Sequence, residues 1–334
     1  MLEVRPGPDP YVFYKMHHMD RVRSAWALSE EIGLFEVLRD GPRTVSEVAK
    51  SLELTDRSTA SLLSANGCLG ILGNDEGRWF IHPIMREFVL EDGRARTTPH
   101  QDRDEYLYRV TKQAVLTGVP VPEEMPPWLT DPDGHEEESV AFSPGRHGWR
   151  ILWGEALAEA FDFTPYRLVV DLGGATGGVL VGLTGKVPGL KGILMELPFS
   201  RAGAEAAIEK SGGADRVSFF SGNFFEGPYP EGADVIFMSH VIHDWNDAEC
   251  LTLLGHCFEA LPAGSPVIIQ EYLLDDDKTG QLLGVGQWLG LLHSTSGDQR
   301  TAGEIGALLE QAGFADVESR PIDNEQTIVV GYKK

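Results

Sequence analysis

Cysteine and long apolar runs are scarce in this sequence of 334 residues. The three cysteines, Cys68, Cys250 and Cys257, have neither the even number nor the spacing of a disulfide framework or a zinc knuckle. Small buried thiols in a reducing compartment are therefore expected. No stretch approaches about 18 uninterrupted apolar residues, so nothing is expected to span a bilayer. Residues 1–14 carry prolines and charges where a signal peptide needs an apolar run, which predicts a cytoplasmic protein.

Lysine and arginine are also few compared with aspartate and glutamate. The sequence has 28 Lys and Arg against 51 Asp and Glu, so its formal net charge is −23. An acidic surface of this kind repels the phosphate backbone of nucleic acids and the surface of an anionic membrane. We therefore expect neither a nucleic acid nor a membrane as a partner. The hydrophobic fraction of 42% is ordinary for a globular protein and excludes a disordered chain.

Residues 1–95 predict a small, mainly helical domain. Apolar residues recur at helical spacing between residues 15 and 38. Thr44 begins a Thr-x-x-Glu capping box, and Thr55 or Asp56 is expected to cap the next helix. A turn and a short strand follow. Helices followed by a hairpin are typical of a winged helix, so we expect a winged-helix-like domain here.

Two roles are open for this domain. Its apolar stripe from Val22 to Leu38 exceeds what one small domain needs for its core, which favours dimerisation with a second copy of the chain. DNA binding by a regulator is the remote alternative. The recognition helix expected at residues 56–68 holds Arg57 as its single Lys or Arg, whereas a DNA reader needs several. The sequence therefore favours a homodimerisation domain.

Residues 96–163 are expected to form a linker or lid with connecting helices. The segment is polar and rich in proline, and it ends in a helical pattern at residues 149–161. Strands alternate with helices over residues 164–334, and the end of the chain is typical of a hairpin. This order predicts an α/β Rossmann-like domain, with a mostly parallel seven-stranded sheet that includes a terminal antiparallel hairpin.

A glycine-rich turn, DLGGATGG at residues 171–178, directly follows the first strand of the predicted sheet. Glycines let a backbone turn tightly and approach a ligand closely. The turn matches the dinucleotide pattern G-x-G-x-x-G poorly. Glu196 lies 19 residues beyond Gly177, at the end of the next strand, where an acid can accept hydrogen bonds from ribose hydroxyls. Together these features predict a cofactor of the nucleoside type.

Four motifs carry a resemblance to a known family: DLGGATG, MELP, SGNFFE and HVIHDWND. They resemble those of class I S-adenosylmethionine-dependent methyltransferases, and more narrowly the two-domain O-methyltransferases of bacterial natural-product and plant phenolic metabolism. The resemblance implies a Rossmann-like domain that binds S-adenosylmethionine and a winged-helix-like domain that dimerises. It also implies an enzyme that transfers a methyl group to a small-molecule acceptor.

The resemblance further implies a set of residues around the cofactor: Asp171, Gly173, Gly174, Glu196, Leu197, Asn223, Phe224, Ser239 and Trp245. The first three would line its methionine end, and Ser239 would touch the same moiety. Glu196 would hold both ribose hydroxyls, while Leu197 and Trp245 would pack near the adenine. Asn223 departs from the aspartate of the family, although its amide oxygen can still accept a hydrogen bond from the adenine amino group.

His243, in the His-Asp-Trp triplet, matches the general base of the family. Histidine suits this role because its unperturbed pKa of about 6.5 lets it take a proton at neutral pH. Glu271, at the end of the fifth strand, matches an acid that orients the base. The second family acid is replaced by Gln299. These residues predict O-methylation of a hydroxyl, with His243 and Glu271 as the catalytic pair.

A second chemistry stays open at this stage. His243, Asp244 and His293 would together supply two imidazoles and one carboxylate, a set that can hold Zn²⁺ or Fe²⁺ with open positions. Such a metal could chelate an α-keto acid and assist methylation of its β-carbon. His240 and His256 are expected to be core or helical residues. O-methylation without a metal is the leading interpretation.

Overall fold

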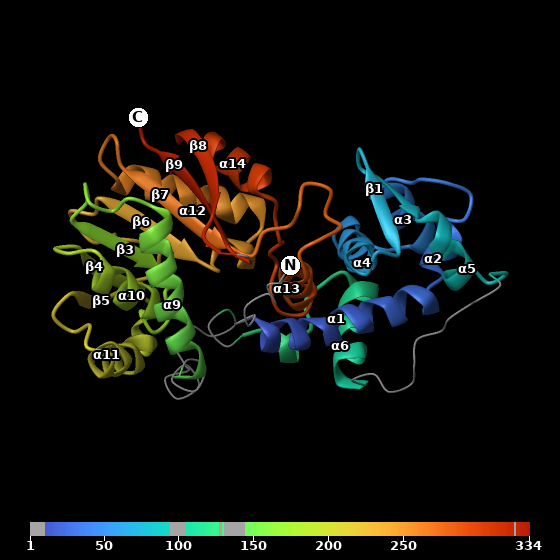
Figure 1. Ribbon diagram of the computed structural model, residues 1–334, viewed down its shortest axis with the longest axis horizontal. Helices are drawn as coiled ribbons and strands as arrows, with labels where there is room; N and C mark the ends of the chain where they lie inside the picture. The colour runs from blue at the N-terminus through green and yellow to red at the C-terminus, as the bar shows by residue number, and fades with distance from the viewer. Residues whose placement is uncertain (1–10, 94–104, 127–128, 130–143, 324) are drawn as a thin grey trace, which may run out of the picture. The chain divides into compact units, whose positions relative to one another are not determined.

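The computed structural model describes the chain in five stretches: residues 11–93, 105–126, 129, 144–323 and 325–334, with the backbone alone for residues 144–146 (Figure 1). Parts of the predicted linker, residues 96–104, 127–128 and 130–143, therefore lie outside the described residues. None of the described helices is both long enough and apolar enough to cross a lipid bilayer.

The chain folds into two compact units. Residues 1–121 together with residues 274–294 make up the first unit, and residues 122–273 together with residues 295–334 make up the second. Residues 274–294, which the sequence pattern placed with the Rossmann-like domain, thus join the first unit. The predicted linear boundaries near residues 95 and 163 stay predictions.

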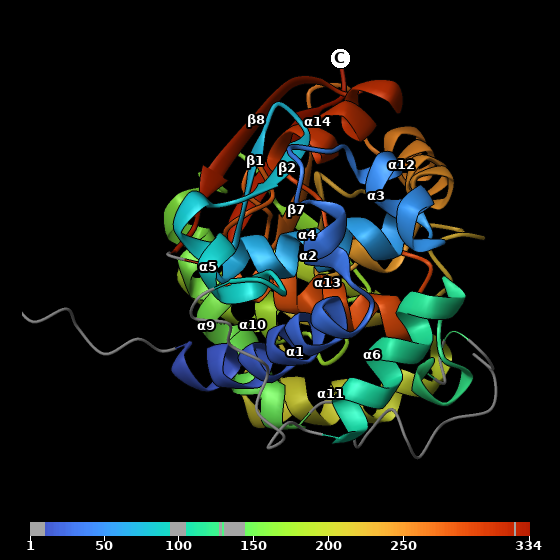
Figure 2. The same cartoon turned by 90° about the vertical axis from the view of Figure 1, so that its right-hand side faces the viewer.

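The first unit consists of helices and one hairpin (Figure 2). Its elements are α1 (Val12–Glu31), α2 (Leu34–Val37), α3 (Val45–Leu52), α4 (Asp56–Cys68), β1 (Leu72–Asp75), β2 (Arg78–Ile81), η1 (Pro83–Met85), α5 (Arg86–Val89), α6 (Glu105–Thr117) and α13 (Leu282–Ser294). The helix expected over residues 15–38 is divided at Gly33, whose φ of 75° is left-handed and favours glycine. The capping box of Thr44 and Glu47 is confirmed, and Thr55 is the N-cap of α4.

The apolar stripe from Val22 to Leu38 lies in the core of the first unit. Its fully buried members include Val22, Leu28, Leu34 and Leu38. Helix α1 packs against α13, α6 and α4 (Figures 1 and 2). Residues far apart in sequence thus cover the stripe. We expected the stripe to be larger than the apolar surface that one domain can bury. This expectation was wrong, because the first unit buries the stripe against its own helices, including α13.

The second unit is built around one sheet of seven strands in the order β5-β4-β3-β6-β7-β9-β8 (Figure 1). The strands are β3 (Leu168–Leu172), β4 (Lys191–Glu196), β5 (Val217–Ser221), β6 (Val235–Ser239), β7 (Pro266–Glu271), β8 (Ala315–Pro321) and β9 (Thr327–Tyr332). From β5 to β7 neighbouring strands are parallel, and β9 pairs antiparallel with both β7 and β8. The predicted parallel sheet with a terminal antiparallel hairpin is confirmed.

Both faces of this sheet are covered. Successive strand residues point to opposite faces, so Val169 packs in one apolar cluster with α9, α10 and α11, while Val170 packs in another with α12 and α14. The described helices of the second unit are α9 (Pro144–Ala160), α10 (Gly178–Lys186), α11 (Arg201–Lys210), α12 (Asp247–Ala260) and α14 (Ala302–Gln311), with short turns η2 (Pro122–Glu124), η3 (Pro198–Ser200) and η4 (Ile242–Asp244). This leaves the carboxyl ends of the parallel strands as the place for a site.

Candidate active site

The carboxyl end of β3 carries a buried carboxylate. Asp171 is fully buried, and neither of its carboxylate oxygens has a hydrogen-bond partner among the described residues. Burial raises the pKa of Asp171 to about 8, although the positive charge of Arg150 opposes this shift. A Cβ atom added to Gly174 would lie 2.2 Å from Asp171 Oδ2, so only glycine allows this close approach. A buried acceptor with open hydrogen-bonding capacity is typical of a ligand contact.

The glycine-rich turn is tied to the end of β4. Glu196 Oε1 accepts a hydrogen bond from the backbone N–H of Ala175 at 3.2 Å, and Oε2 accepts one from the N–H of Leu197 at 2.7 Å. Burial raises the pKa of Glu196, and these two hydrogen bonds oppose the shift. Ala175 and Gly177 both have left-handed backbones, with φ of 53° and 71°. The strained turn and the predicted ribose acid therefore form one local structure.

His147 contacts the glycine-rich turn through the side chain of Thr176. His147, on α9, places Nδ1 2.9 Å from the hydroxyl of Thr176 and Nε2 2.9 Å from the hydroxyl of Ser211. Its contacts give it a structural role at the turn.

Aromatic side chains gather where the other predicted cofactor residues lie. Trp245 meets Phe225 edge-on with ring centroids 4.6 Å apart, and Phe224 at 6.1 Å. Asn223 Oδ1 accepts a hydrogen bond from the backbone N–H of Phe225 at 3.0 Å. The hydroxyl of Ser239, at the end of β6, is buried and without a hydrogen-bond partner among the described residues.

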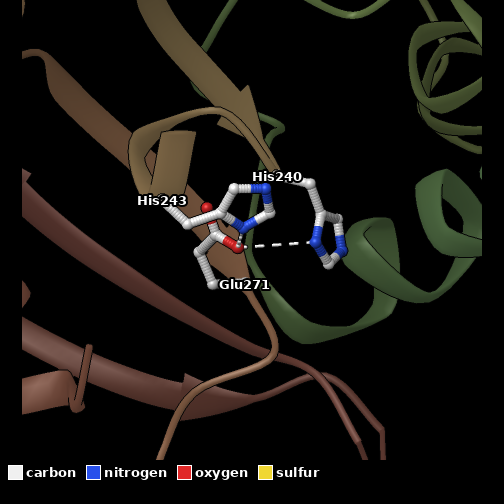
Figure 3. Close-up of side chains that lie close together, drawn as sticks. All are labelled: His240, His243 and Glu271. Carbon is white, nitrogen blue, oxygen red and sulfur yellow. Dashed lines mark hydrogen bonds and ion pairs between the residues drawn. The ribbon is translucent and has the colours of Figure 1, made fainter. Parts of the chain in front are cut away.

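Two histidines share one carboxylate at the ends of β6 and β7 (Figure 3). His243, in η4, places Nδ1 2.7 Å from Glu271 Oε2, and His240 places its own Nδ1 3.4 Å from the same oxygen. His243 Nε2 lies 3.7 Å from Asp244 Oδ1. His243 is 5% exposed and Glu271 1% exposed. The structure thus brings together the predicted base and the predicted acid.

Burial and charge shift these groups in opposite directions. Burial alone would lower the pKa of His243, but the charges of Glu271 and Asp244 and the hydrogen bond to Glu271 raise it to about 9. Burial raises the pKa of Glu271, but His243 outweighs this effect and the net shift is downward. Burial lowers the pKa of His240 to about 4 and raises that of Asp244 to about 6. His243 and Glu271 therefore form a buried ion pair, beside a neutral His240.

His240 is the site residue that sequence analysis missed. It directly follows β6 with a left-handed φ of 55°, and its ring contacts those of Trp153 and Tyr272, with centroids 5.1 and 4.5 Å away. Its Nε2 lies 3.3 Å from Gln326 Oε1. The spacing His-x-x-His in HVIH was the available signal. Among the described residues, His240, His243 and Glu271 are the one group whose possible metal-ligand atoms all lie within 4.8 Å of one another.

Gln299 and His293 form hydrogen bonds with residues other than His243 and Glu271. Gln299, which replaces the second family acid, is 2% exposed, and its amide nitrogen donates to the backbone carbonyl of Tyr272. His293 lies on α13 in the first unit, buried, with Nε2 3.2 Å from the hydroxyl of Thr111. Burial and the charge of Arg21 lower its pKa to about 4. His243 and Asp244 belong to the second unit, so the predicted metal triad stays a prediction.

Comparison with known proteins identifies the family. Residues 126–315 match the model of the O-methyltransferase domain. The chain is 30% identical to 3-hydroxy-5-methyl-1-naphthoate 3-O-methyltransferase of Streptomyces sahachiroi over 299 residues, 86% of this chain and 84% of that protein. It is 30% identical to acetylserotonin O-methyltransferase of Bos taurus over 321 residues, 91% of this chain and 92% of that protein.

Solved structures share the fold. An O-methyltransferase family 2 protein from Planctomyces limnophilus, solved with apigenin, superimposes with a TM-score of 0.84 at 20% identity and covers 98% of this chain and 97% of its own. Human N-acetylserotonin methyltransferase, solved with S-adenosylmethionine, gives 0.61 at 24% identity over 99% of both chains.

The chain belongs to the family of S-adenosylmethionine-dependent O-methyltransferases and is an enzyme that methylates a small acceptor. These relatives give no support to the alternative of α-keto acid C-methylation.

Proposed function

We propose that the enzyme methylates a hydroxyl of a small natural-product acceptor, with His243 as the general base and Glu271 as the acid that orients it. The observation that carries this proposal is the 2.7 Å contact between His243 Nδ1 and Glu271 Oε2. A carboxylate on Nδ1 holds the proton there, so the neutral ring presents the lone pair of Nε2 to an incoming hydroxyl.

The residues at the ends of β3, β4 and β6 fit S-adenosylmethionine. The unpartnered oxygens of Asp171 suit the ammonium group of its methionine end, and Glu196 suits its ribose hydroxyls. Leu197, Asn223, Phe224 and Trp245 are proposed for the adenine, while Gly173, Gly174 and Ser239 are proposed for the methionine end. When bound, the cofactor supplies an electrophilic methyl group on a sulfonium centre.

The protein's own part in the reaction is to bind, aim and deprotonate the acceptor. As the hydroxyl proton moves to His243 Nε2, the ring becomes an imidazolium. The carboxylate of Glu271 stabilises this charge, because a buried opposite charge in hydrogen-bond contact favours the protonated form. The same stabilisation gives His243 a raised pKa, so the ring must release a proton before it can act. Activity should therefore depend on pH.

We also propose that the enzyme is a homodimer, and we assign the contact to the first part of α1. Val12, Phe13, Met16 and Met19 are 45, 77, 64 and 37% exposed, and three of them recur at helical spacing. An exposed apolar stripe of this kind favours burial against a second copy of the chain.

An acceptor screen tests the proposed reaction. Purified enzyme is incubated with radiolabelled S-adenosylmethionine and a panel of phenols and α-keto acids. With an active phenol, His243→Ala should lose about 10²–10⁴-fold in kcat, the usual cost of removing a general base. His293→Ala should lose much less, and His82→Ala, just after the hairpin of the first unit, should match the wild type. Equal losses in the two site variants, with stoichiometric metal in the wild type, would refute the metal-free base.

A further inference from the structure

We propose that Arg300 is a positioning residue that clamps the turn carrying His243, and so sets where the base meets the acceptor. The inference rests on the proposed role of His243. It concerns the segment from Gly297 to Arg300, which joins α13 to α14 and has no part in the function described so far.

The guanidinium of Arg300 holds both ends of the turn. Its Nη1 donates to the carbonyl oxygen of Ile242 at 3.1 Å, and its Nη2 donates to that of Trp245 at 2.9 Å. These two carbonyls flank the His243–Asp244 pair directly. Because the guanidinium is planar and rigid, two hydrogen bonds from one fork fix the separation of the two carbonyls.

The side chain of Arg300 is itself held in place. It is 5% exposed, and Nη1 also donates to the carbonyl oxygen of Asp298 at 3.1 Å. Nη2 and Nε reach Asp247 Oδ1 at 2.7 and 3.1 Å. The Asp247 side chain is 74% exposed, so this ion pair is largely screened by water. The buried contacts of Arg300 are thus those to backbone carbonyls of the turn and of its own segment.

Gly297 brings the backbone of the segment against the same turn. A Cβ atom added to Gly297 would lie 1.9 Å from the carbonyl oxygen of His243 and 2.4 Å from the carbonyl carbon of Asp244. Both distances are far below van der Waals contact. The turn is therefore held both by the Arg300 fork and by direct backbone packing against Gly297.

Such a clamp matters because η4 is a short turn. It spans Ile242–Asp244, and its N-cap residue makes no side-chain hydrogen bond. Positioning errors of about 1 Å can cost on the order of 10²-fold in rate. A lysine at this position would keep the charge but would lack the planar fork that bridges two carbonyls.

The test uses two acceptors: a phenol active in the screen and its ring-dinitrated analogue, whose hydroxyl is largely ionised at neutral pH and needs no base. Arg300→Lys should lower kcat about 10–100-fold with the parent phenol, but only a few-fold with the dinitrated analogue. Asp247→Asn, which removes the exposed ion pair, should leave both rates unchanged. Melting temperature and S-adenosylmethionine affinity, measured by calorimetry, follow folding and the cofactor site separately.

Equal losses with both acceptors, or a wild-type kcat in Arg300→Lys, would overturn the inference. If Arg300→Lys does not fold, Arg300→Gln, which buries no unpaired ammonium but also lacks the planar fork, should show the same selective loss. Failure of the proposed function is distinguishable. In that case His243→Ala retains activity on the parent phenol, whatever the Arg300 variants do.

Discussion

The ion pair between His243 and Glu271 predicts an unusual pH dependence. A pKa of about 9 for His243 exceeds the ordinary value of 6.5, and each pKa unit corresponds to about 1.36 kcal/mol, so the folded site favours the imidazolium by roughly 3 kcal/mol. At pH ~7 only about 1% of the free enzyme then holds a neutral His243 that can accept a proton. We expect kcat/KM to rise about tenfold per pH unit from pH ~6 to ~8 and to level near pH ~9.

Glu271→Gln weakens the interactions that raise the pKa of His243. The variant removes the Glu271 charge and its charge-assisted hydrogen bond, while the burial that lowers the pKa and the Asp244 charge that raises it remain. The pKa of His243 should therefore fall from about 9, and kcat/KM should level off at a lower pH than in the wild type. The plateau should be lower than that of the wild type, because no carboxylate stabilises the imidazolium that forms during the reaction.

The assay is the pH profile of kcat/KM with one phenol, supported by NMR titration of the His243 ring in the free enzyme. Glu259→Gln, at an exposed site on α12, is the matched control and should keep the wild-type profile. A profile of Glu271→Gln that coincides with the wild type, or that moves to higher pH, would refute the reasoning. Either result would mean that Glu271 does not raise the pKa of His243.

Two further predictions concern the cofactor and the assembly. Glu196→Ala should weaken S-adenosylmethionine binding at least about tenfold, because each charge-assisted hydrogen bond to a ribose hydroxyl contributes about 1.5–3 kcal/mol. Calorimetry measures the affinity, and an unchanged affinity would contradict the assignment. Glu205→Ala, at an exposed position, is the control. The double variant Phe13→Glu and Met16→Glu should be monomeric by light scattering at micromolar concentration, whereas Ile84→Glu, at another exposed apolar position, should stay dimeric. A monomeric wild type would end the proposal of a homodimer.

Local features of the fold could be predicted from the sequence. Thr44 and Thr55 cap their helices as expected, because a cap depends on a few neighbouring residues. The order of strands and helices after residue 164 was also readable, since short apolar runs and glycine turns are local signals. The motifs DLGGATG and HDW resemble those of S-adenosylmethionine-dependent O-methyltransferases, which is the family that the comparisons show.

Contacts between distant segments could not be predicted in this way. The stripe from Val22 to Leu38 looked like a spare surface because nothing in its own neighbourhood shows that α13, some 250 residues later, packs on it. His240 looked like a core residue because its proximity to Glu271 arises only where the ends of β6 and β7 meet. The pKa values of His240, His243 and Glu271 also depend on burial and on charge interactions that arise only in the folded protein.

The sequence by itself determined which residue types were present: a histidine able to take a proton, an acid and a glycine turn. Only the tertiary structure decided that His243 and Glu271, 28 residues apart, form a buried ion pair, and that Arg300 holds the carbonyls on either side of His243. The physical reason is that local structure follows from interactions between neighbours. The strength of a base, by contrast, depends on the charges and the solvent that the whole fold places around it or removes from it.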